Sequence, residues 1–168
     1  MTAARQRRKT RWCGYRLWLV LGLTLVSGNL APLAAKVAGN LSIVTDPRTG
    51  LAISGFDPVA YFTDAAPKPG RPEMEYNQAG TVWQFRNAGN LAAFADNPEV
   101  YAPQFGGYDP VAIARGASVP GHPLFWLVSG QRLYLFYSDE ARAAFAADPV
   151  RIIEAAERKW AAVQRTLP

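Results

Sequence analysis

The pattern of apolar and polar positions predicts two β-hairpins. Aromatic and aliphatic residues recur along both at the spacing of sheet packing, and a two-residue turn containing glycine joins the strands of each. The predicted strands are residues 73–78 and 81–85 in the first hairpin and residues 124–129 and 132–137 in the second, with turns at Ala79-Gly80 and Gly130-Gln131.

Helix signals precede and follow each hairpin. The Asp-Pro pairs that begin at Asp57 and Asp109 predict short helices, because aspartate caps free amides and proline suits the first helical position. Asn87 and Ser138 are predicted N-caps of a helix after each hairpin, which ends before a proline. A longer amphipathic helix follows the second copy, with an apolar stripe of Ile152, Ile153, Ala156, Trp160 and Val163.

These elements recur because the sequence repeats itself. Gly55-Phe56-Asp57-Pro58-Val59-Ala60 returns as Gly107-Tyr108-Asp109-Pro110-Val111-Ala112, and later blocks follow in the same order, including Ala-Ala-Phe-Ala around Phe94 and Phe145. A unit of roughly 45 residues buries too little surface to be stable alone. We therefore predict one α+β domain of two hairpin-plus-helix units, residues 55–101 and 107–152, that share a core.

The N-terminal segment is typical of a secretory signal. Basic residues precede a short apolar run over residues 17–26 and a small-residue stretch ending near residue 35. We expect a signal peptide over 1–35, a linker over 36–50 and the folded domain over 51–168. The protein is then periplasmic or secreted, with a mature chain that begins near Lys36. The alternative is an uncleaved N-terminal membrane anchor, although the apolar run is shorter than a spanning helix requires.

Charge and cysteine content argue against two classes of function, nucleic-acid binding and cysteine-based chemistry. The formal charge is +5, but six of the 18 basic residues lie in the signal segment, and the remainder is 12 basic against 13 acidic residues. This balance argues against a nucleic-acid partner. The single cysteine, Cys13, also lies in that segment, so the mature chain contains no disulfide, thiolate ligand or cysteine nucleophile.

Several motifs in order resemble those of exported YHS-domain proteins. They are Gly55-Phe56-Asp57-Pro58-Val59-Ala60-Tyr61-Phe62, Trp83-x-Phe85, the run from Phe94 to Tyr108 that ends in Gly106-Gly107-Tyr108, and Leu133-Tyr134-Leu135-Phe136-Tyr137. The resemblance covers residues 51–163 and implies a small α+β fold, mostly without assigned activity. Related modules handle metals through a cysteine, which in exported relatives commonly follows Gly-Gly-Tyr. Here Asp109 stands at that place.

Asp109 therefore has two interpretations. It matches Asp57 in the repeat, so both can be helix caps, which is the interpretation that we favour. The alternative is a metal-binding or metal-delivery protein that uses Asp109, Asp57 and His122. One histidine and one mature methionine, Met74, do not make a transition-metal site of the His/Met type, and no calcium-loop motif is present.

The sequence predicts no catalytic residues and no cofactor. No nucleophile elbow, phosphate loop or triad accompanies His122, whose counterpart is Arg71. We expect an exported, non-catalytic binding or interaction module for an unknown small ligand or protein partner, with a small pocket between the copies. The candidate ligand-binding residues are Tyr61, Tyr108, Asp109 and His122. Other aromatic residues are expected mostly to form core, with the lining of a ligand pocket as the alternative: Trp83, Trp126, Tyr134, Tyr137 and Trp160.

Overall fold

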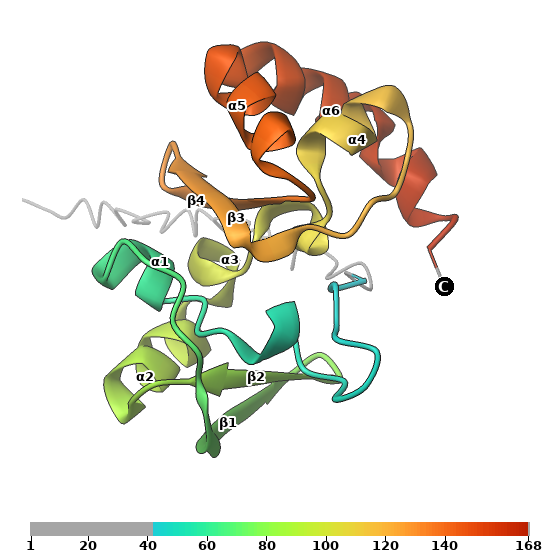
Figure 1. Ribbon diagram of the computed structural model, residues 1–168. Helices are drawn as coiled ribbons and strands as arrows, with labels where there is room; N and C mark the ends of the chain where they lie inside the picture. Colours follow the sequence, from blue (N-terminus) through green and yellow to red (C-terminus); the bar gives the residue numbers. More distant parts are fainter. Residues whose placement is uncertain (1–41, 168) are drawn as a thin grey trace, which may run out of the picture. The chain divides into compact units, whose positions relative to one another are not determined.

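The computed structural model describes residues 42–167, which form a mixed α+β fold of two antiparallel hairpins and the helices around them (Figure 1). In chain order, the elements are η1 Ile53–Gly55, α1 Ala60–Thr63, β1 Arg71–Gln78, β2 Thr81–Phe85, α2 Ala88–Asp96, α3 Pro98–Tyr101, η2 Gln104–Gly107, α4 Pro110–Arg115, β3 His122–Ser129, β4 Arg132–Phe136, α5 Asp139–Ala147 and α6 Pro149–Gln164.

The internal repeat predicted from the sequence is confirmed element by element. The hairpin β1–β2 and helix α2 correspond to β3–β4 and α5, each 51 positions later. Both hairpins shift register at the same place, between Arg71 and Glu75 in the first and between His122 and Trp126 in the second. Both turns use two residues with positive φ, as the twist of a two-residue hairpin requires.

The predicted N-caps and the equivalence of two phenylalanines are confirmed as well. The Asn87 side chain accepts from the Asn90 amide and that of Ser138 accepts from the Ala141 amide. Phe94 and Phe145 are both fully buried, each on the helix that faces its own hairpin. Phe94 lies 4.8 Å from the Trp83 ring and 5.2 Å from Phe85, and Phe145 repeats these contacts at 4.8 and 5.1 Å with Tyr134 and Phe136.

Strand β4 carries the contact between the two copies. Its residues alternate between two apolar clusters, because successive side chains of a strand point to opposite faces. Tyr134 and Phe136 pack with Phe145 in the second copy, whereas Leu133 and Leu135 join the cluster of the first copy around Phe94. The copies thus share a core as predicted, although the buried residues form three clusters rather than one.

The two copies pack head to tail, and different elements cover the exposed end of each copy. In the first copy, η1 and α1 are covered by the β3–β4 hairpin. In the second copy, the equivalent η2 and α4 are covered instead by α6, through Ile113, Ala156 and Val163. The β1–β2 hairpin carries Glu75 and Gln84 where the second hairpin has Trp126 and Leu135. A helix at one end and polar residues at the other therefore close the array.

Residues 42–46 correct the predicted linker in the part that the structure describes. The Val44 amide donates to the Gly106 carbonyl at 2.8 Å, and the Val44 carbonyl accepts from the Ile53 amide at 3.0 Å. This strap therefore ties the left-handed turns η1 and η2 together, while Ile43 and Val44 pack on two apolar clusters. Gly106 has φ +65°, and a Cβ there would lie 2.2 Å from the Ser42 carbonyl oxygen, so only glycine fits.

The predicted signal segment, residues 1–35, and the first part of the predicted linker lie outside the described residues. Within residues 42–167, no helix has the length and apolar character needed to cross a membrane.

Candidate functional site

A groove of about 730 Å³ lies between the two copies. We call it the inter-repeat groove. Helix α1 and the residues after it form one wall, strand β3 forms the floor, and helix α5 forms the other wall. The lining residues are Tyr61, Phe62 and Ala65 of the first copy and Trp126, Leu127, Val128, Asp139, Arg142, Ala143 and Ala146 of the second.

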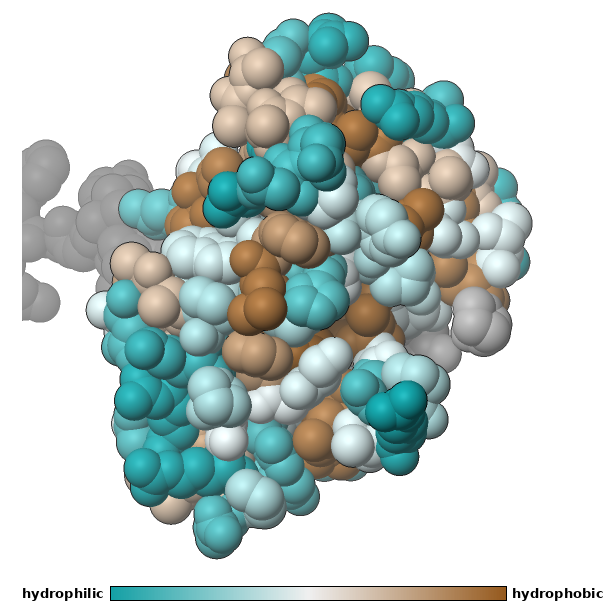
Figure 2. Space-filling model, in the orientation of Figure 1, coloured by the Kyte–Doolittle hydropathy of each residue, from teal (hydrophilic) through white to brown (hydrophobic). Residues whose placement is uncertain are grey.

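The groove has no equivalent on the first copy, because it forms where one copy stacks on the other. Its α5 wall comes from residues spaced i, i+3, i+4 and i+7, which share one face of the helix. The corresponding face of α2 in the first copy has no preceding copy to supply a second wall. In the space-filling view, apolar side chains lie across the middle of the face at the level of β3, whereas hydrophilic ones cover the lower left, over β1 and α2 (Figure 2).

Tyr61 is part of the groove wall rather than a free polar group. Its side chain is 1% exposed, and its ring meets Trp126 edge to face at 5.3 Å. The hydroxyl donates to the Pro123 carbonyl at 3.0 Å. Burial, and next the negative charge of Asp57, raise the pKa of Tyr61, so the hydroxyl stays protonated and keeps this bond.

The charged rim of the groove is internally paired. Asp139 and Arg142, one turn apart on α5, form an ion pair. Asp64, which precedes Ala65 of the opposite wall, is paired with Arg86. The groove thus combines an apolar interior with a rim whose charges cancel.

Two of the other predicted residues lie in a different depression. Tyr108 and His122 line a hollow of about 540 Å³ beside the strap, together with Ser54, Thr81 and residues 120–123. Burial raises the pKa of Tyr108. His122 is exposed, its Nδ1 accepts from the Leu124 amide at 3.2 Å, and its ring lies 5.6 Å from Phe125. The predicted set therefore does not form one pocket.

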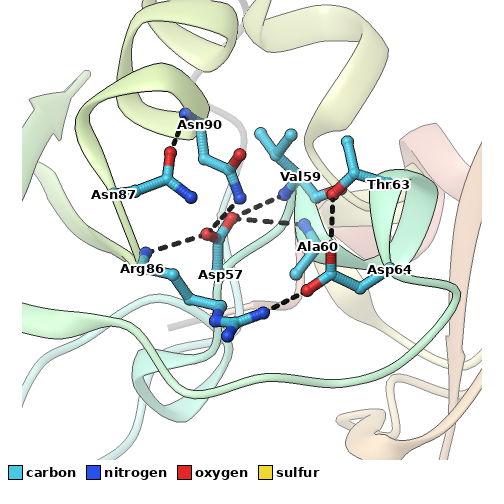
Figure 3. Close-up of polar contacts among 8 residues, drawn as sticks. All are labelled: Asp57, Val59, Ala60, Thr63, Asp64, Arg86, Asn87 and Asn90. Carbon is cyan, nitrogen blue, oxygen red and sulfur yellow. Dashed lines mark hydrogen bonds and ion pairs between the residues drawn. The ribbon is translucent and has the colours of Figure 1, made fainter.

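Asp57 is buried in the first copy and bonds to three separate segments (Figure 3). We call such an aspartate, with the groups that donate to it, a clasp. The Asp57 side chain is inaccessible to solvent, and its two oxygens accept four hydrogen bonds. Oδ1 accepts from the Val59 and Ala60 amides at 2.9 and 3.3 Å. Oδ2 accepts from the Arg86 amide at 2.9 Å and from Asn90 Nδ2 at 2.7 Å. The carboxylate therefore closes the turn that leads into α1 and also fastens it to the end of the hairpin and to α2.

Asp109 makes the equivalent clasp with fewer donors. Its side chain is 3% exposed, and Oδ1 accepts from the Val111 and Ala112 amides at 2.8 and 3.4 Å. Oδ2 accepts from the Tyr137 amide at 3.1 Å, and Ala141 stands where the first copy has an asparagine. The predicted N-cap role is confirmed for Asp109 at α4, whereas α1 has Val59 as its N-cap and Asp57 closes the turn that leads into this helix. In both copies the bond from Oδ2 to the end of the hairpin is additional.

The three residues of the metal hypothesis are not brought together. The oxygens of Asp57 and Asp109 already face protein donors in separate copies, and His122 lies in the hollow beside the strap. Among residues 42–167, no group of three or more histidine, cysteine, aspartate or glutamate side chains is placed to hold a metal ion.

Sequence reasoning missed most of the groove, including Phe62, Arg142, Ala143 and Ala146. Trp126, which the sequence assigns to the core with a pocket position as the alternative, packs on the cluster of the first copy and also lines the groove. One signal was available, because Trp126 replaces Glu75 of the first copy. A position that is charged in one copy and aromatic in the other marks a surface with a different role in each.

Comparison of the chain with protein-family models, with curated proteins and with solved structures found no match.

Proposed function

We propose that the chain is an exported, non-catalytic binding module, YHS-like as its motifs suggest, that takes a small ligand in the inter-repeat groove. The observation that carries this proposal is the groove itself. Its volume of about 730 Å³ lies in the range of small-molecule sites, which are roughly 300–1,000 Å³ and mostly apolar. Sites of this kind prefer boundaries between structural units.

The chemistry of the lining supports binding rather than catalysis. The titratable side chains in the lining are Tyr61, Asp139 and Arg142. Tyr61 donates to the Pro123 carbonyl, and Asp139 and Arg142 form a solvent-exposed ion pair on one helix. A general acid or base needs a group poised to exchange a proton with the substrate, and the buried Tyr61 hydroxyl, with its raised pKa and its bond to Pro123, is not such a group.

A fluorescence titration with phenylnaphthylamine, a neutral dye that brightens in apolar sites, tests the proposal. We expect saturable binding of one dye per chain. Ala143→Phe fills the groove and should weaken binding at least about tenfold, a loss of about 1.4 kcal/mol. Ala92→Phe is the matched control, since Ala92 is the exposed counterpart of Ala143 on α2 and lines no part of the groove. Equal effects of the two changes, or no saturable binding, would refute the proposal.

Export is tested separately by the intact mass of the native protein. We expect a chain that begins near Lys36, in the periplasm or the medium, because the basic and apolar segments resemble a cleaved signal. A full-length chain recovered from membranes would instead support the anchor.

A further inference from the structure

We infer that the ligand of the inter-repeat groove is an uncharged, largely apolar molecule with an aromatic ring system. This inference rests on the proposed function and specifies the ligand class. It follows from the pairing of the rim charges, from the engagement of the Tyr61 hydroxyl and from the composition of the walls.

The rim charges select against an ionic ligand of either sign. Arg142 is held by Asp139 on the same helix, and Asp64 on the other side is held by Arg86. Asp64, Arg86 and Glu140 lie outside the lining, whose charged residues are Asp139 and Arg142. The lining thus carries no net charge to offset the water that an ion would lose on entering the groove, and such a transfer is costly. A neutral ligand avoids this cost.

The walls favour aromatic rings. Phe62 and Trp126 are partly exposed, and both already take part in edge-to-face contacts, with Tyr101 at 5.4 Å and with Tyr61 at 5.3 Å. A further ring can extend these arrays at similar spacing. Ala65, Ala143 and Ala146 contribute small apolar side chains to the same lining. The Tyr61 hydroxyl donates to the Pro123 carbonyl, so it is not available as a donor to the ligand.

The test is displacement of bound phenylnaphthylamine by three compounds that share one ring system: naphthalene methanol, naphthalene sulfonate and naphthyl trimethylammonium. In the wild type, the neutral compound should displace the dye at a concentration at least about tenfold lower than either ion, because only the ions must be desolvated without a counter-charge.

Two variants make the test specific to the rim. Asp139→Asn frees Arg142 and should improve displacement by the sulfonate about two- to fivefold, whereas Arg142→Gln should do the same for the ammonium compound. Both positions are exposed on α5, and circular dichroism verifies the fold. If either ion matches the neutral compound in the wild type, or if neither variant shifts the preference, the ligand class is wrong while dye binding stands. Absence of dye binding would overturn both proposals.

Discussion

Replacing Asp57 by asparagine is expected to destabilise the fold by roughly 2 to 5 kcal/mol, more than the same change at Asp109, at about 1 to 3 kcal/mol. An asparagine oxygen can still accept the two amides that Oδ1 accepts. Its NH₂ group, however, would face the N–H donors that now bond to Oδ2, and these donors would lose their acceptor. There are two such donors at Asp57, the Arg86 amide and Asn90 Nδ2, and one at Asp109. Urea unfolding of the two variants measures the difference.

Asp148→Asn is the control for this comparison. Asp148 also precedes a proline and caps a helix, but it is partly exposed, and its side chain accepts from Arg151 of its own helix. Asparagine caps as well as aspartate, so this change should cost less than about 1 kcal/mol. The clasp account fails if Asp57→Asn is no more harmful than Asp148→Asn. The sequence alone predicts a nearly neutral Asp109→Asn, and the bond from the Tyr137 amide revises that expectation.

Truncation of Phe94 or of Phe145 to alanine is expected to cost about 3 to 5 kcal/mol each, as for other buried phenylalanines. Both side chains are fully buried and pack on two aromatic rings of their own hairpin. Unfolding should remain a single transition in both variants, because Leu133 and Leu135 of the second copy belong to the cluster around Phe94. Thermal and urea unfolding followed by circular dichroism measure the free energy of unfolding and the number of transitions.

Exposed Ala92 and Ala144 give the control positions, where substitution by serine should change stability by less than about 0.5 kcal/mol. A melt of Phe94→Ala or Phe145→Ala within error of the wild type would contradict the equivalence of the two anchors. Two separate transitions would contradict the shared core.

The repeat explains which parts of the fold are predictable from the sequence. Asn87, Ser138 and Asp109 act through local hydrogen bonds, so their spacing predicts the helices that they begin. Asp57 makes the same local bonds, but they close a turn and α1 starts at Ala60. The second half of each clasp is not local. The Arg86 amide reaches Asp57 only after the hairpin has folded back, and Asn90 has no counterpart in the second copy.

The strap and the groove were harder to predict for the same physical reason. Val44 has no equivalent in the repeat. Its short apolar run predicts only a linker, because the turns to which it bonds belong to both copies and are distant in the sequence. The groove arises from the stacking of one copy on the other, which joins Phe62 to Trp126 and Ala143. Such a juxtaposition depends on the packing angle between copies, which local pattern does not encode.

The central claim is that the ligand binds between the copies, and the indole signals in ¹H–¹⁵N spectra test it most directly. Three tryptophans lie in the described part of the chain, Trp83, Trp126 and Trp160, and Trp126 alone among them lines the inter-repeat groove. Trp126→Phe assigns its signal. On titration with phenylnaphthylamine, the Trp126 indole signal should shift and saturate while the signals of Trp83 and Trp160 remain in place. A shift confined to Trp83 or Trp160, or no shift at all, would contradict the account.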